Sequence, residues 1–114
     1  MSDRFSRLLA EYALSVRTQE LAPAVAHEVK RRILDAFGVA LAAFAEPTPR
    51  AARAYAVPFA VADGALLWGT AMRAAPDVAA FVNGTMVRYL DFNDTYLSRE
   101  PLHPSDVIPR CGRW

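Results

Sequence analysis

The chain has 114 residues, of which 54% are apolar, and its 13 basic and 12 acidic residues give a formal net charge of +1. This length suits one domain with a buried core, and the composition excludes a disordered tail. Charges of both signs are interspersed, which argues against the basic face of a nucleic-acid-binding protein. The sequence shows no apolar run long enough to cross a membrane and no signal-peptide pattern at its start. Because Cys111 is the only cysteine, neither a disulfide framework nor a Cys-based zinc site is expected, and we predict a reduced, cytoplasmic protein.

A first helix is predicted from the start of the chain to a connection near residues 18–20. Ser2 or Asp3 can cap this helix, because their side-chain oxygens accept hydrogen bonds from backbone N–H groups. The apolar positions recur every three to four residues, which is typical of a helix with one apolar face. These positions are Phe5, Leu8, Leu9, Tyr12, Ala13 and Val16.

A second helix is predicted from Pro23, which suits a first helical turn, to the turn that begins at Glu46 and Pro47. Apolar residues keep the helical spacing throughout, and from Ile33 onward they lie on nearly every side. A helix of this kind is normally central and packed by several neighbours. The basic run 30–32 is interpreted as a solvated face of the same helix.

The middle of the chain is predicted to form a short helix, a loop and a short strand. Thr48 can cap a third helix that has Pro49 at its first position and ends near Val57. Residues 60–64 are predicted to form a loop. The apolar run 65–69, which is bounded by glycines, is consistent with a small strand.

A fourth helix is predicted to begin at Pro76 and Asp77 and to carry apolar residues at helical spacing as far as Tyr89. Gly84 costs this helix roughly 1 kcal/mol relative to alanine, so close packing is expected at that position. Taken together, the four helices predict a mainly α fold that allows one short strand.

Residues 91–109 have no apolar periodicity and form a polar loop that is dense in reactive groups. Histidine titrates near neutral pH, so His103 can serve as an acid or a base, and a carboxylate such as Asp91 can orient it. A second reading is a divalent-cation site made by Asp91, Asp94 and His103, although no repeated ligand spacing supports it. In a third reading these residues only form turns and helix ends through bonds to the backbone.

Three segments, in this order along the chain, resemble the MmgE/PrpD family. The first is VKRRILDAFGVA at residues 29–40; the second is Trp68-Gly69-Thr70 with APDVAAFVNGT at 75–85; the third is RYLDFNDTY at 88–96 with His103-Pro104-Ser105-Asp106. Together the segments span nearly the whole chain as far as Pro109, and the combination is more specific than any one of them.

The resemblance implies the fold, the chemistry and the site of that family. Its members have a large helical domain that starts at the N-terminus and a smaller α+β lid; they form homodimers and need no metal or organic cofactor. They include cis-aconitate decarboxylase and the 2-methylcitrate dehydratase of the methylcitrate cycle of propionate catabolism, and the loop with Asn93 is closer to the dehydratase branch. By this resemblance Asp91, Thr95 and His103 line the substrate pocket. We take His103 and Asp91 as the candidate catalytic residues, and Thr95 and Ser105 as the candidate binding residues for a small di- or tricarboxylate.

These residue types suit a dehydration. The reaction needs a base that takes a proton next to a carboxylate and an acid that helps hydroxide to leave. Our hypothesis is that His103 contributes to proton transfer or carboxylate binding, and that Asp91 sets its orientation and charge.

We expect residues 1–109 to form part of the family's N-terminal helical domain. Residues 110–114 depart from the family pattern, and we expect them to be an unrelated tail that results from a truncation or a frameshift. The family's chains are several times longer and contribute further pocket residues, so a hydro-lyase fragment that is inactive by itself is expected. Two alternatives are open. One is a member of the cis-aconitate decarboxylase type, and the other is a non-catalytic helical remnant that self-associates through its apolar faces.

Overall fold

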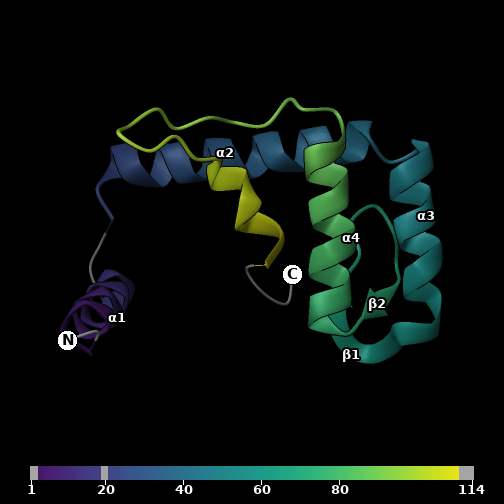
Figure 1. Cartoon of the computed structure of the whole chain (residues 1–114), viewed down its shortest axis with the longest axis horizontal. Helices are drawn as coiled ribbons and strands as arrows, with labels where there is room; N and C mark the ends of the chain where they lie inside the picture. Colours follow the sequence, from purple (N-terminus) through teal and green to yellow (C-terminus); the bar gives the residue numbers. More distant parts are fainter. Residues whose placement is uncertain (1–2, 19–20, 111–114) are drawn as a thin grey trace. The chain divides into compact units, whose positions relative to one another are not determined.

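The computed structural model describes residues 3–18 and 21–110, which form helices joined by turns and a small sheet (Figure 1). This confirms the mainly α fold. The chain divides into two compact units, residues 1–30 and 31–114, which are described separately here. The helices are α1 (Asp3–Thr18), α2 (Pro23–Ala42), α3 (Pro47–Ala56) and α4 (Pro76–Tyr89), with 3-10 turns η1 (Val57–Phe59), η2 (Pro104–Asp106) and η3 (Ile108–Arg110). None of these described helices has the length and apolarity needed to cross a membrane.

The first unit contains α1, which begins at Asp3 as the sequence predicts. The alternative cap Ser2 and residues 19–20 of the predicted connection lie outside the described residues. The apolar stripe of α1 faces solvent, since Phe5, Leu8 and Tyr12 are 67%, 60% and 68% exposed. The periodicity therefore identified the helix correctly.

In the second unit, the part of α2 from residue 31 onward buries one face. Ala36, Ala40 and the following Ala43 are at most 1% exposed, whereas Leu34 and Leu41 are 74% and 51% exposed. The expectation of a helix covered on several sides is therefore wrong for the described residues. Small alanines let neighbouring backbone approach closely on one side only.

Helix α3 begins at Pro47, two residues before the predicted first position. Glu46 is the N-cap, with an extended backbone, and its carbonyl accepts the first helical bond from the Arg50 N–H at 3.0 Å. Thr48 lies inside the helix, so its predicted role as a cap is wrong. Both Pro47 and Pro49 can occupy a first turn because the N–H groups missing there have no helical partner, and the helix starts at the earlier one.

The predicted loop at residues 60–64 is in fact part of strand β1 (Ala60–Leu66), which pairs antiparallel with β2 (Arg73–Ala74). In this register Ala65 lies opposite Ala74, with an irregularity before it. The Arg73 guanidinium also donates to the Gly64 carbonyl at 2.9 Å. Alanine and glycine have little strand propensity, so the pairing with β2, rather than local sequence, sets this strand.

The turn after β1 places Trp68 in the core. Gly69 has φ +77°, and a Cβ there would lie 2.8 Å from the Phe44 ring, so both the backbone conformation and the packing favour glycine. The Thr70 hydroxyl donates to the Leu67 carbonyl at 2.8 Å and accepts from the Met72 N–H at 3.1 Å. These bonds close the turn that leads into β2.

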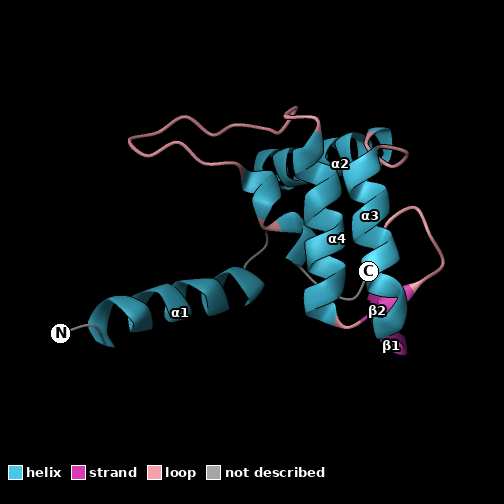
Figure 2. Cartoon of the chain, turned by 45° about the vertical axis from the view of Figure 1, so that its right-hand side comes forward, coloured by secondary structure: helices cyan, strands magenta, loops and turns pink. Residues whose placement is uncertain are grey.

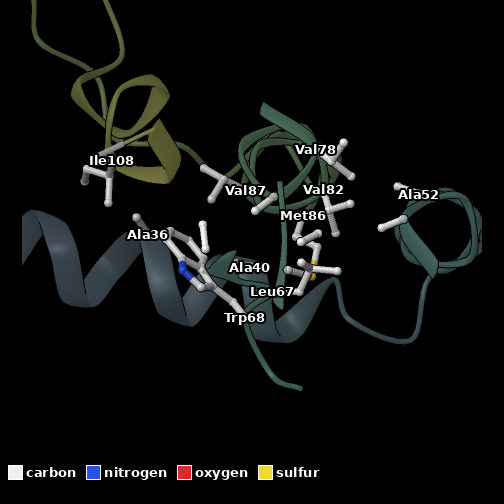
Figure 3. Close-up of a cluster of buried hydrophobic side chains, with 14 residues drawn as sticks. Ala36, Ala40, Ala52, Leu67, Trp68, Val78, Val82, Met86, Val87 and Ile108 are labelled. Carbon is white, nitrogen blue, oxygen red and sulfur yellow. The ribbon is translucent and has the colours of Figure 1, made fainter. Parts of the chain in front are cut away.

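Helix α4 occupies the predicted residues and packs beside α3, with the sheet near the end where α4 begins (Figure 2). One compact core joins α4 to α2, α3, the 65–68 segment and η3 (Figure 3). The close packing expected at Gly84 is wrong, because a Cβ there would meet nothing within 4 Å among the atoms considered. The tightly enclosed residue is its neighbour Asn83, which is 2% exposed. The core side chains labelled in the figure are Ala36, Ala40, Ala52, Leu67, Trp68, Val78, Val82, Met86, Val87 and Ile108.

Candidate functional site

The polar loop after α4 folds back on itself (Figure 1). Tyr96 and Leu102 form an antiparallel bridge, in which the Tyr96 N–H donates to Leu102 at 2.8 Å and the Leu102 N–H donates back at 3.1 Å. Because the two arms run in opposite directions, residues 93–95 on one arm come beside residues 103–105 on the other. The bridge thus brings together the two halves of the segment that the sequence singles out.

Asp94 lies at the centre of this pairing. Its side chain is 9% exposed, and its Oδ2 lies 2.6 Å from Nη1 of Arg32 on α2. Its other oxygen, Oδ1, accepts from the Ser105 N–H at 2.9 Å. Burial by itself would raise the pKa of Asp94, but hydrogen bonds from Ser105 and Arg32 outweigh it and hold the pKa below the usual value. Asp94 is therefore held as a carboxylate between the loop and α2.

Asn93 and Ser105 connect the same cluster to the end of α4. The Asn93 amide donates to the Val87 carbonyl at 3.1 Å and to the Ser105 hydroxyl oxygen at 3.2 Å. Val87 lies in the last turn of α4, where carbonyls have no helical partner, so Asn93 acts as a side-chain cap. Ser105 is fully buried. Its hydroxyl is therefore engaged by the protein in this structure.

His103 is partly buried and adjoins Asp94. Its Nδ1 lies 2.7 Å from the main-chain carbonyl oxygen of Asp94. The ring is thus oriented by the backbone of Asp94, whereas our hypothesis gave that task to Asp91. Nε2 of His103 is not part of this contact.

Asp91 lies just after the C-cap of α4, Leu90, and has φ +56°. Its N–H donates to the Arg88 carbonyl at 3.3 Å, and within residues 3–18 and 21–110 its exposed carboxylate makes no hydrogen bond or ion pair. A residue in the left-handed conformation at this position commonly ends a helix. The geometry therefore matches the reading of Asp91 as a helix-ending residue, while its catalytic assignment stays a prediction.

The four predicted site residues divide into two pairs. His103 and Ser105 both contact Asp94. Asp91 and Thr95 are exposed, and neither side chain joins that network among the described residues. The geometry groups two of the four and leaves the other two at the surface.

Replacing Asp91 with glycine is expected to stabilise the chain by about 1 kcal/mol, because glycine adopts a left-handed conformation without the steric cost of a Cβ. Replacement with valine should destabilise it by about 1–2 kcal/mol. Asparagine, which tolerates this conformation, is the matched control and should change stability by only a few tenths of a kcal/mol. Urea unfolding followed by circular dichroism measures all three. A stability loss in the glycine variant would contradict the helix-ending role.

Sequence reasoning missed Arg32 and underrated Asp94. Arg32 was assigned to a solvated helix face, but its side chain is only 21% exposed and pairs with an acid 62 residues away. No local pattern connects these two positions. The signal that was available is the density of polar residues around Asp94, which cannot indicate the partner on another element.

Two other features bear on binding. Across the described parts of the chain, no group of three or more His, Cys, Asp or Glu residues is arranged to hold a metal ion. A groove of about 600 Å³ lies between α3 and α4, lined mainly by apolar side chains that include Tyr55 and Phe81, with Asp77 beside them. This groove contains none of the four predicted site residues.

Comparison with known proteins agrees with the resemblance in the sequence. The model of the MmgE/PrpD N-terminal domain matches residues 7–111. The chain is 36% identical over 106 residues to a 2-methylcitrate dehydratase of Salmonella typhimurium, which covers 91% of this chain and 22% of the relative. A 2-methylcitrate dehydratase of Cupriavidus necator is 34% identical over 104 residues, and a probable 2-methylcitrate dehydratase of Saccharomyces cerevisiae is 42% identical over 48 residues.

The chain spans about a fifth of the length of the bacterial relatives it matches. No solved structure matches it. The predicted boundary at Pro109 stays a prediction, and residues 111–114 of the predicted tail lie outside the described residues. Since the domain model matches nearly the whole sequence, the chain belongs to the MmgE/PrpD family, in its N-terminal domain.

Proposed function

We propose that this chain forms the N-terminal part of a hydro-lyase similar to 2-methylcitrate dehydratase, which eliminates water from a small tricarboxylate. The observation that carries the proposal is the 36% identity to such an enzyme over 91% of the chain. Most of each bacterial relative lies outside the matched region. Catalytic groups that act as a unit are not additive, so the chain by itself should be inactive.

In this elimination a base takes a proton from the carbon next to a carboxylate, a carbon–carbon double bond forms, and the hydroxyl group leaves as water with a proton from an acid. We assign proton transfer to His103, whose Nε2 is left outside the contact with Asp94. Asp91 is the second catalytic candidate and offers an exposed carboxylate. The reaction draws only on acid and base groups of the protein.

Substrate binding is assigned to Thr95 and Ser105. The exposed Thr95 hydroxyl is free to donate to a substrate carboxylate. Ser105 is fully buried in this structure, so its assignment rests on the hypothesis from the sequence. The two residues therefore differ in how directly the geometry supports them.

We further propose that the whole protein is cytoplasmic and homodimeric. Exposed apolar residues are available for further contacts, both on α1 and along the groove between α3 and α4. This supports association in general, while the twofold arrangement comes from the family resemblance.

A chimera tests the catalytic proposal. Residues 7–111 replace the matched region of the Salmonella enzyme, and dehydration of 2-methylcitrate is measured as formation of the unsaturated product. We expect His103→Ala to lower kcat by about 100-fold or more, which is the usual contribution of a general acid or base. Asp91→Asn, which keeps the backbone conformation and removes the charge, should also lower kcat by about 100-fold or more, on the same scale of acid–base effects.

The matched control is His27→Ala, because His27 is an exposed histidine on α2 outside the loop. It should retain the parent rate. Circular dichroism melting shows whether each chimera is folded. A folded His103→Ala chimera with the parent kcat would overturn the assignment, and the same substitution at the matched position of the intact Salmonella enzyme provides a second test.

A further inference from the structure

Two neighbouring contacts of Asp94 bear on the chemistry of His103. The main-chain carbonyl of Asp94 meets His103 Nδ1, and its carboxylate meets the N–H of Ser105, two residues further on. Asp94 therefore contacts both His103 and Ser105, the two ends of the turn that carries the imidazole. A third contact, the ion pair between the Asp94 carboxylate and Arg32, connects this turn to α2.

The contact with the carbonyl determines which nitrogen of His103 is basic. A carbonyl oxygen only accepts hydrogen bonds, so Nδ1 must carry the hydrogen. In the neutral ring the lone pair is then on Nε2. The arrangement therefore presents Nε2 as the nitrogen that can take a proton.

The carbonyl can favour one tautomer only if it is held in place, and the side chain of Asp94 supplies that restraint. Both carboxylate oxygens are bonded, and the side chain is 9% exposed. Its partner Arg32 precedes Ile33, which packs against the core, so the anchor is on a rigid element. A buried carboxylate needs such partners, because an unpaired one carries a large desolvation cost.

We infer that Asp94 is a positioning residue of this site: its carboxylate fixes the 93–95 arm so that its carbonyl holds His103 with Nδ1 protonated and Nε2 basic. The catalytic meaning of this arrangement rests on the proposed function, in which His103 transfers the proton. The tautomer itself does not depend on any activity. It can be measured directly on this chain.

The test is long-range proton–nitrogen NMR of the two imidazoles in the ¹⁵N-labelled chain, above the pH at which histidine is charged. His27, which is exposed, gives the solvent tautomer mixture as an internal reference, and a His27→Gln sample assigns the signals. We expect the ratio of Nδ1–H to Nε2–H at His103 to be about tenfold higher than at His27, since one net hydrogen bond of roughly 1.4 kcal/mol corresponds to that factor. A His103 mixture equal to that of His27 in the unmodified chain would overturn the inference without any variant.

Asp94→Ala should bring the His103 ratio to that of His27. Asp94→Asn, which keeps the shape and weakens the bond to Arg32, should give an intermediate ratio and serves if the alanine variant does not fold. Asp106→Asn is the matched control, because Asp106 is a half-exposed acid near the same turn whose contact with Arg88 is 3.6 Å. It should leave the ratio unchanged.

A His103 ratio that stays about tenfold above that of His27 in a folded Asp94→Ala chain would overturn the positioning role. The two proposals fail separately. In the unmodified chain, the absence of a preference at His103 alongside an active chimera counts against positioning only. A preference that Asp94→Ala removes, alongside an inactive, folded chimera, counts against the proposed function only.

Discussion

Replacing Trp68 with alanine is expected to destabilise the chain by about 3–5 kcal/mol, the usual cost of removing a buried tryptophan. Trp68 is 1% exposed and stacks on Phe37 with ring centroids 4.1 Å apart. It lies between α2 and the neighbouring elements of the core (Figure 3). A small domain has a total free energy of unfolding of about 5–15 kcal/mol, so this change should remove a large fraction of the stability. Urea unfolding followed by far-ultraviolet circular dichroism measures it.

Phenylalanine at position 68 should cost less, about 1–2 kcal/mol, because it keeps the apolar contact. It also removes an indole N–H that has no partner among the described residues. Phe92→Ala is the surface control, since Phe92 is 72% exposed, and its effect should stay within about 0.5 kcal/mol. Equal losses for Trp68→Ala and Phe92→Ala would contradict the core described here.

Asn83→Ala is expected to cost about 2–4 kcal/mol, because two hydrogen bonds in and around the core lose their partner. The side-chain oxygen of Asn83 accepts a hydrogen bond from the main-chain N–H of Trp68 at 3.0 Å, and its side-chain NH₂ donates to the main-chain carbonyl of Leu66 at 3.0 Å. These bonds join α4 to the segment that leaves β1. Their loss leaves the Trp68 N–H, at a residue 1% exposed, without an acceptor.

Asn83→Asp separates the two bonds. The carboxylate still accepts from the Trp68 N–H but cannot donate to the Leu66 carbonyl, and burial of its charge adds a further cost. The control is Thr85→Ala on the same helix, where an exposed hydroxyl bonds to the Phe81 carbonyl, and a change within about 0.5 kcal/mol is expected. An Asn83→Ala effect no larger than this control would show that the two bonds do not hold the segment.

The helices could be predicted because their signals are local. Pro23 and Pro76 begin α2 and α4, and apolar spacing follows each of them. The start of α3 was displaced because two prolines, Pro47 and Pro49, both satisfy the rule for a first turn. Periodicity also identifies a face without saying whether anything covers it, and Leu34 and Leu41 on the apolar part of α2 are exposed.

The predicted strand at 65–69 overlaps β1 only at residues 65–66, and neither its pairing with β2 nor the buried asparagine could be predicted in this way. Strand β1 depends on pairing with the two residues of β2 across the turn. The alanines and the glycine of β1 have little strand propensity, so the local sequence does not indicate this pairing. The role of the buried Asn83 follows from its hydrogen bonds to backbone groups of the 66–68 segment. Such partners become visible only when the chain is folded.

The candidate site follows the same division. Composition singled out the segment 91–109, and the resemblance selected Asp91, Thr95 and His103 within it. The carboxylate at its centre is Asp94, because the bridge between Tyr96 and Leu102 decides which residues of the two arms meet. Its partner Arg32 lies on α2, and nothing in the sequence of the loop indicates that these two residues pair.

The central claim is that this chain supplies the N-terminal part of a dehydratase. The most direct measurement compares the folded chimera carrying residues 7–111 on two substrates, 2-methylcitrate and cis-aconitate. The account predicts formation of an unsaturated tricarboxylate from 2-methylcitrate and no release of carbon dioxide from cis-aconitate. Release of carbon dioxide would instead indicate the decarboxylase alternative, and a folded chimera that acts on neither substrate would contradict the catalytic account.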